Sequence, residues 1–175
     1  MKQGITMIGM AGAGKSGVGR ILAEKLGWKF VDLDKLILEK QGITHHEYMK
    51  QSGEEALKKL EEQLTMDLDF AQTVFSPPGS VIYWESNFLK KIKDESTIVY
   101  LQTDPQTIAK RLGDRLYKNG IIGLEEKGLE GLIAERTPLY EKLADYTFHS
   151  ADQSKDEMAQ TVLKGLKMHE ISQHK

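Results

Sequence analysis

The segment 9–16, with the sequence GMAGAGKS, constrains the chain more than any other, because it fits the pattern G-x-x-x-x-G-K-S/T at every fixed position. An apolar run at 4–8 precedes it, and from Lys15 onward apolar residues recur at helical spacing. Glycines allow the backbone to fold around an anion with its N–H groups inward, and the following helix points its positive end at the same phosphates. A glycine-rich turn that binds nothing is the alternative interpretation, but the complete motif between a strand and a helix favours a phosphate site.

The same motif assigns roles to individual side chains. Lys15 would neutralise charge on the β- and γ-phosphates of ATP, and the Ser16 hydroxyl would ligate Mg²⁺. We therefore expect a nucleotide site made by Gly12, Ala13, Gly14, Lys15, Ser16 and Gly17.

Short apolar runs alternate with helical patterns along the rest of the chain. Strands are predicted at 4–8, 28–31, 73–75, 97–101 and near 146–148, and helices at 15–26, over 33–41, from about Gly53, after Asp104-Pro105, and through Met158, Val162 and Leu166. This alternation indicates βαβ units, and hence an α/β fold whose parallel sheet is covered on both faces. The segment 113–128 contains four glycines and little periodicity, so it is the candidate for a mobile lid.

Composition excludes several classes of protein. A chain of 175 residues fits a single domain, 1–175, and 24 Lys and Arg against 26 Asp and Glu give no basic footprint for nucleic acid. The absence of cysteine excludes disulfides and thiolate metal sites. No apolar run approaches the roughly 20 residues of a membrane span, and no secretory signal is recognisable. We expect a soluble, cytoplasmic protein without a nucleic-acid or membrane partner.

Two carboxylates, Asp32 and Asp34, follow the second predicted strand, at the edge of the sheet where ligands bind in open α/β folds. In extended chain, residues two apart point the same way, so both could face one site. One could hold the water shell of Mg²⁺ while the other accepts a proton from a hydroxyl nucleophile. Either residue could equally be a solvated N-cap of the next helix, and the spacing alone does not separate the two interpretations.

The sequence His45-His46-Glu47 suggests a metal site, but adjacent histidines point in different directions on a helix. We therefore interpret this segment as a solvated helix start.

Several segments together resemble the shikimate kinases. They are 9–20 (GMAGAGKSGVGR), 30–34 (FVDLD), Gly53-Glu54 with Leu57-Lys58 and Glu61, and 135–140 (ERTPLY). Their order and spacing match that family over nearly the whole chain. The phosphate loop alone would be generic, whereas the other segments make the resemblance specific.

The resemblance implies a P-loop NTPase-type three-layer sandwich, with a five-stranded parallel sheet, helices on both faces and a lid. It implies phosphoryl transfer from ATP, with Mg²⁺, to the 3-hydroxyl of shikimate. The expected partner is this small-molecule substrate, and we expect a monomer.

The resemblance also implies roles for site residues. Asp32, assisted by Ser76, would hold the water shell of the metal, and Asp34 would bind substrate hydroxyls and act as the base. Arg136 matches the arginine that holds the substrate carboxylate, with Lys58 and Gly79 on the same substrate side. Arg111 lies where the family has an arginine near adenine, and Arg115 is the nearest candidate for the catalytic lid arginine.

The chain departs from the family pattern mainly on the substrate side. Leu57-Lys58 stands where the family has Phe-Arg, and a lysine lacks the planar fork with which arginine binds a carboxylate. Pro78-Gly79-Ser80 replaces a Gly-Gly-Gly turn, and Gly17 replaces a Thr or Ser near the α-phosphate. The lid has Asp114-Arg115-Leu116-Tyr117 in place of Arg-Pro-Leu.

These departures keep two alternatives open. One is a kinase of the same fold that phosphorylates another small hydroxylated acid, such as gluconate. The other is a nucleotide-binding regulator without turnover. The joint retention of Lys15, Ser16, Asp32, Asp34 and Arg136 favours catalysis.

Overall fold

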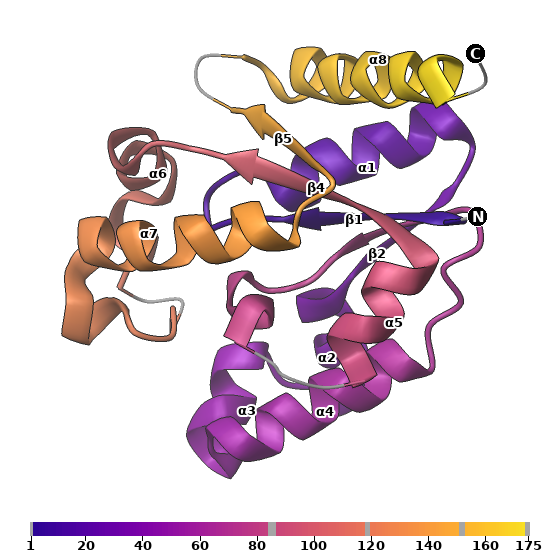
Figure 1. The fold of residues 1–175 in the computed structure, drawn as a ribbon. Coiled ribbons are helices and arrows are strands. Elements are labelled where there is room, and N and C mark those ends of the chain that lie inside the picture. The colour runs from indigo at the N-terminus through magenta and orange to yellow at the C-terminus, as the bar shows by residue number, and fades with distance from the viewer. Residues whose placement is uncertain (1, 84–86, 118–119, 151–152, 174–175) are drawn as a thin grey trace.

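Five parallel strands form a single sheet in the computed structural model, which describes residues 2–83, 87–117, 120–150 and 153–173 (Figure 1). The strands are β1 (Gly4–Ile8), β2 (Lys29–Asp32), β3 (Thr73–Ser76), β4 (Ser96–Gln102) and β5 (Tyr146–His149). Their order across the sheet is β2-β3-β1-β4-β5, and every pairing is parallel. The five predicted strands and the parallel sheet are therefore confirmed.

Helices cover both faces of this sheet. They are α1 (Lys15–Leu26), α2 (Leu33–Gln41), α3 (His45–Ser52), α4 (Glu54–Met66), α5 (Asn87–Glu95), α6 (Pro105–Leu112), α7 (Leu124–Leu143) and α8 (Lys155–Gln173), with short 3₁₀ helices η1 (Gly79–Tyr83) and η2 (Gly113–Arg115). In Figure 1, α1 and α8 lie together above the sheet, and α2, α3, α4 and α5 lie below it. The three-layer α/β arrangement is confirmed.

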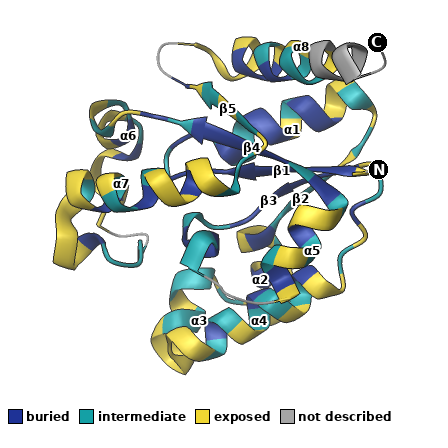
Figure 2. Ribbon diagram, in the orientation of Figure 1, coloured by how far each residue is buried: buried dark blue, intermediate teal, exposed yellow. Residues whose placement is uncertain are grey.

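The central strands are buried on both faces, which explains their continuous apolar sequences (Figure 2). Along β4, Val99 and Leu101 join a core with α1 and α8, whereas Ile98 and Tyr100 join a second core on the opposite face. The alternation of side chains along a strand thus builds two separate apolar layers from one sequence.

Helix ends follow local signals in the sequence. Gly27 and Gly42 end α1 and α2 in the left-handed conformation, with φ of 68° and 73°. The Asp104 carboxylate accepts a hydrogen bond from the Thr107 N–H at 2.8 Å, ahead of a proline at the first position of α6. These ends agree with the predicted helix boundaries.

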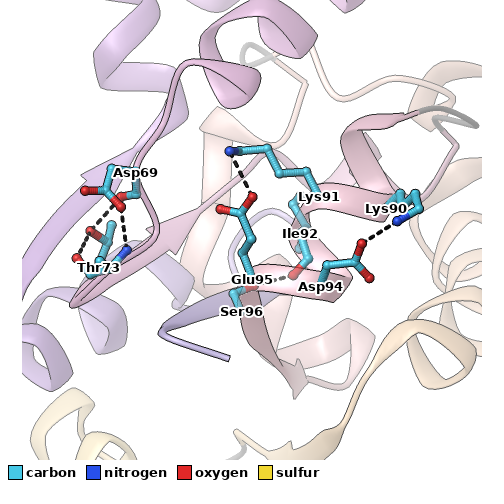
Figure 3. Close-up of polar contacts among 9 residues, drawn as sticks. Asp69, Thr73, Lys90, Lys91, Ile92, Asp94, Glu95 and Ser96 are labelled. Carbon is cyan, nitrogen blue, oxygen red and sulfur yellow. Dashed lines mark hydrogen bonds and ion pairs between the residues drawn. The ribbon is translucent and has the colours of Figure 1, made fainter. Parts of the chain in front are cut away.

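Side-chain hydrogen bonds fix the amino ends of β3 and β4, at the edge opposite the phosphate loop (Figure 3). Thr73 Oγ1 donates to the Asp69 carbonyl at 3.0 Å, which closes the turn before β3. Ser96 Oγ donates to the Ile92 carbonyl at 2.8 Å and lies 2.6 Å from Thr6 Oγ1 of β1. These buried hydroxyls are therefore paired, as buried polar groups must be.

The predicted lid segment 113–128 is partly helical. It begins with η2, and its last residues form the first turn of α7, which kinks at Gly128 (φ 65°, ψ 172°). Residues 118–119 lie outside the described residues, and the mobility of the segment stays a prediction. None of the helices in the described ranges combines the length and apolar character needed to cross a membrane.

Candidate active site

One large cavity, of about 1200 Å³, opens at the carboxyl edge of the sheet. Its wall is formed by the phosphate loop, the starts of α2 and α3, the 76–80 segment, the α6–lid region, Arg136 in the middle of α7, and the start of α8. This is the place where ligands bind in open α/β folds, and the volume exceeds the usual 300–1,000 Å³ or so of a site for one small molecule. The cavity therefore has room for a nucleotide and an acceptor together.

The phosphate loop requires glycine for two physical reasons. Gly9 and Gly12 have φ of 139° and 81°, a region that other residues rarely adopt. A Cβ at Gly9 would lie 2.7 Å from the Leu101 carbonyl oxygen, and one at Gly12 would lie 2.9 Å from Leu112 Cγ. The predicted nucleotide residues, Gly12, Ala13, Gly14, Lys15, Ser16 and Gly17, all line the cavity.

The ammonium group of Lys15 lies under this loop. Its Nζ donates to the carbonyls of Gly9 and Met10 at 2.9 and 3.0 Å, and the side chain is buried. Burial lowers the pKa of Lys15 to about 8, although the nearby carboxylates of Asp34 and Asp32 oppose the shift. Near neutral pH a fraction of Lys15 is therefore uncharged, and an anion bound beside it would favour the charged form.

Ser16, Ser76 and Asp32 supply oxygen atoms next to the loop. Ser16 Oγ and Ser76 Oγ are 3.4 Å apart, and all three residues line the cavity. Asp32 is also the N-cap of α2, where its Oδ1 accepts from the Lys35 N–H at 3.3 Å. The N-cap interpretation of Asp32 is therefore confirmed, and its carboxylate is oriented by the helix it caps.

These oxygen donors fit Mg²⁺, which is commonly held by one or two protein oxygens together with waters and substrate phosphates. Within the described ranges, no group of three or more His, Asp or Glu side chains could hold a metal ion without such help.

Asp34 reaches the cavity by a different route from the one predicted. It lies in the first turn of α2 and not in an extended segment, because the helix begins at Leu33. Its carboxyl faces the cavity, and the surrounding protein desolvates it and raises its pKa. The charge of Asp32 adds to this rise, whereas His45 and Lys15 oppose it.

Arg136 is a buried cation on α7, with a side chain only 1% exposed. Its Nη2 donates to the Ile122 carbonyl at 2.7 Å, and its Nε donates to the Tyr83 hydroxyl at 3.2 Å. The guanidinium lies over the Tyr83 ring, 5.0 Å from the centroid. Among the described residues, no carboxylate forms an ion pair with it. A buried, preoriented guanidinium without a counter-ion is suited to an anionic ligand.

Gly79 and Lys58 have different positions. Gly79 lines the cavity, and its carbonyl accepts from the Tyr140 hydroxyl at 2.6 Å. Lys58 does not line the cavity, and its Nζ lies 3.5 Å from both Glu54 Oε1 and Glu55 Oε1. The structure therefore brings Gly79 to the predicted substrate side together with Asp34 and Arg136, but not Lys58.

Arg111 in the last turn of α6 and Arg115 in η2 both line the cavity. Arg111 Nη1 donates to the Ala13 carbonyl at 3.2 Å and Nη2 donates to the Ser150 carbonyl at 3.2 Å, so it joins the phosphate loop to the segment after β5. Arg115 is exposed, and its Nη2 donates to the Arg111 carbonyl at 3.0 Å. Arg111 is thus held in place by the loop, whereas Arg115 extends from the lid segment.

The interpretation of 45–47 as a solvated helix start is wrong for His45. Thr44 does cap α3, but the His45 ring lines the cavity and its Nε2 lies 2.9 Å from Oε1 of Glu61, a fully buried side chain. Sequence reasoning missed this pair because the partners lie on different helices. A glutamate on the apolar face of α4, four residues after Leu57, was the signal available.

Comparisons with known proteins agree with this geometry. A family model described as shikimate kinase matches residues 11–167. The shikimate kinase of Vibrio vulnificus (strain YJ016) is 34% identical over 169 residues, which cover 94% of this chain and 96% of the relative. That of Enterococcus faecalis (strain ATCC 700802 / V583) is 29% identical over 167 residues, with 94% and 99% covered. Among solved structures, the shikimate kinase from Acinetobacter baumannii in complex with shikimate matches with a TM-score of 0.82 and 28% identity, over 97% of this chain and 95% of that one.

Proposed function

Because the chain belongs to the shikimate kinase family, we propose that it transfers the γ-phosphoryl group of ATP to the 3-hydroxyl of shikimate. The chain is an ATP-dependent phosphotransferase with an alcohol as acceptor. The choice of acceptor rests on the buried guanidinium of Arg136, which forms no ion pair with a carboxylate of the described residues. Arg136 lines the same cavity as Asp34 and the phosphate loop. This arrangement fits a ligand with a carboxylate and neighbouring hydroxyls.

The reaction needs a group that accepts the proton of the attacking hydroxyl. Asp34 faces the cavity, and its raised pKa makes it a stronger base than an ordinary aspartate. The hydroxyl oxygen attacks the γ-phosphorus as its proton passes to the carboxylate, and the bond to the β–γ bridging oxygen breaks to release ADP. Lys15 balances the negative charge on the transferred group and on the leaving ADP.

Ser16 and Asp32 are the residues that would hold Mg²⁺, Ser16 by its hydroxyl and Asp32 through water. When bound, the ion would supply positive charge to the phosphate oxygens. The remaining contribution comes from the chain itself, since the loop N–H groups and the N-terminus of α1 orient the phosphates.

The lid segment 113–128 completes this proposal. Arg115 extends from it into the cavity and would reach the transferred phosphoryl group, whereas Arg111 would remain against the nucleotide. The Ile122 carbonyl accepts from Arg136, so the position of the lid is coupled to the residue proposed to bind the acceptor. Closure over both ligands would exclude water from the transferred group.

The experiment that tests the function is ADP release with Mg-ATP across a panel of shikimate, gluconate and related hydroxy acids. We expect saturable turnover with shikimate. Turnover only with another acid would reject shikimate and retain the kinase. ATP binding without acceptor-dependent turnover would indicate a regulator.

A further inference from the structure

The pair formed by His45 and Glu61 has no role in the steps above, although it lies on the acceptor side of the cavity. His45 is the first residue of α3, and its side chain is 15% exposed. A capping box fixes this helix start, because Thr44 accepts from the Glu47 N–H and Glu47 accepts from the Thr44 N–H. The backbone from which the His45 ring projects is therefore fixed.

Glu61 orients the His45 ring through a hydrogen bond. Its side chain is fully buried on α4, and Oε1 lies 2.9 Å from His45 Nε2. The other ring nitrogen, Nδ1, forms no hydrogen bond to any of the described residues. A protonated ring in this arrangement presents Nδ1–H as a donor, while a neutral ring with its proton on Nε2 presents only an acceptor.

The charges around the ring favour the protonated form. Burial by itself lowers the pKa of His45, but the hydrogen bond to Glu61 and the charges of Asp34 and Glu61 outweigh it, so the pKa is raised. The same environment raises the pKa of Glu61 to about 7, chiefly through burial. The charged groups that act on the pair are Asp34 from α2 and Glu54 from α4, and His46, Lys15 and Arg136 line the same cavity.

Lys58 is the residue that the family pattern places as a second cation toward the substrate, but its Nζ lies between Glu54 and Glu55, away from the cavity. We propose that His45, held by Glu61, binds the carboxylate of the acceptor together with Arg136 and so takes the place of Lys58. This inference rests on the proposed function. It assigns the substrate class as a carboxylate-bearing alcohol and names the residue that selects it.

The test is equilibrium binding of shikimate and of its methyl ester, measured by calorimetry without nucleotide between pH 6 and 9. The carboxylate of shikimate stays ionised over this range, and the ester is neutral. For the unchanged protein we expect the affinity for shikimate to fall as pH rises, because His45 loses its proton, whereas the ester shows a much smaller change. Equal pH dependence for acid and ester would overturn the proposal without any variant.

Variants test whether His45 causes the pH dependence of shikimate binding. His45→Gln keeps a donor toward Glu61 but cannot become charged, so at pH 6.5 it should weaken shikimate binding by about tenfold or more and leave ester binding within twofold. Glu61→Gln should shift the fall in shikimate affinity to lower pH, because the carboxylate that raises the pKa of His45 is gone. His149→Gln, at an exposed histidine of β5, is the matched control and should bind like the unchanged protein.

Lys58→Met tests whether Lys58 or His45 binds the carboxylate of the acceptor. We expect less than a threefold change in shikimate affinity, and the same for Lys59→Met one residue away, which is exposed. A tenfold loss in Lys58→Met with none in His45→Gln would overturn the proposal. Normal turnover with shikimate and an unaffected His45→Gln would reject the role of His45 alone, whereas no shikimate binding by the unchanged protein would reject the proposed function as well.

Discussion

The nucleotide side of the cavity is built mainly by one continuous segment, 9–17, to which Arg111 is joined. The acceptor side takes Asp34, His45, Gly79 and Arg136 from elements spread over about a hundred residues. On the first side, glycines and backbone N–H groups form most of the phosphate site, and Lys15 donates to two carbonyls of the same loop. On the second side, each functional group is a side chain that a different element positions.

This difference has consequences for how each side tolerates change. A backbone site depends on φ values and close packing, as at Gly9 and Gly12, so substitution there damages the fold and the site together. A side-chain site allows one residue to replace another from a neighbouring helix, as proposed for His45 and Lys58. The departures from the family pattern fall mainly on the side that can accept them.

The largest effect is expected for Lys15→Met. Removing the ammonium group that lies under the loop should lower kcat with Mg-ATP and shikimate by about a thousandfold, because the charge on the transferred group is no longer balanced. The measurement is steady-state ADP release, with thermal unfolding as the check on the fold. Lys29→Met, at an exposed lysine of β2, is the control, and a Lys15→Met rate within tenfold of it would contradict the role.

Asp34→Asn tests whether the two sides act separately. The amide keeps the shape of the side chain but cannot accept the proton, so kcat should fall by about a hundredfold or more. The affinity for ATP should remain within twofold, because the residue belongs to the acceptor side. A fully active variant would remove Asp34 from the mechanism, and a large loss of ATP affinity would show that the two sides are coupled.

The contrast also explains what could be predicted from the sequence. The fold and the nucleotide residues followed from local signals, since strand, loop and helix are contiguous between Gly4 and Leu26. Asp32 and Asp34 were identified, but their geometry was not, because α2 begins at Leu33 and places Asp34 in a helical turn. The pairing of His45 with Glu61, and the turning away of Lys58, depend on how α3 and α4 pack, which no spacing in the sequence records.

Substitution of Arg115 should change mainly kcat, whereas substitution of Arg111 should change mainly the KM for ATP. Arg115→Ala should lower kcat by roughly ten- to a hundredfold with little change in ATP affinity, because its guanidinium extends from the lid and does not contact the loop. Arg111→Ala should raise the KM for ATP and lower the melting temperature, because it loses contacts to Ala13 and Ser150. An unchanged kcat in Arg115→Ala, with a large loss in Arg111→Ala, would assign the catalytic role to Arg111.

The pH dependence of ATP binding isolates the nucleotide side. Since the pKa of Lys15 is lowered to about 8, the residue is charged below that pH and neutral above it. ATP affinity should therefore fall by about tenfold between pH 7 and 9, as one proton equilibrium predicts. Calorimetry at fixed ionic strength measures this change. Lys15→Arg, whose guanidinium stays charged, should give a flat profile, and a fall of the same size in that variant would place the titrating group elsewhere.

The smallest effect is expected for Gly17→Ser, which restores a hydroxyl near the α-phosphate. Gly17 has no positive φ, and an added Cβ would lie 2.7 Å from Lys155 Cδ, on an exposed and flexible side chain that can move away. One new hydrogen bond should tighten ATP binding by about two- to fivefold. Serine is also a better helix former than glycine, so the melting temperature should rise slightly.

Gly131→Ala, on the exposed face of α7, is the matched control because it raises helix propensity away from the cavity. If both variants gained stability but Gly17→Ser bound ATP no more tightly, the backbone would already satisfy the phosphates. The nucleotide side would then be independent of side chains beyond Lys15 and Ser16.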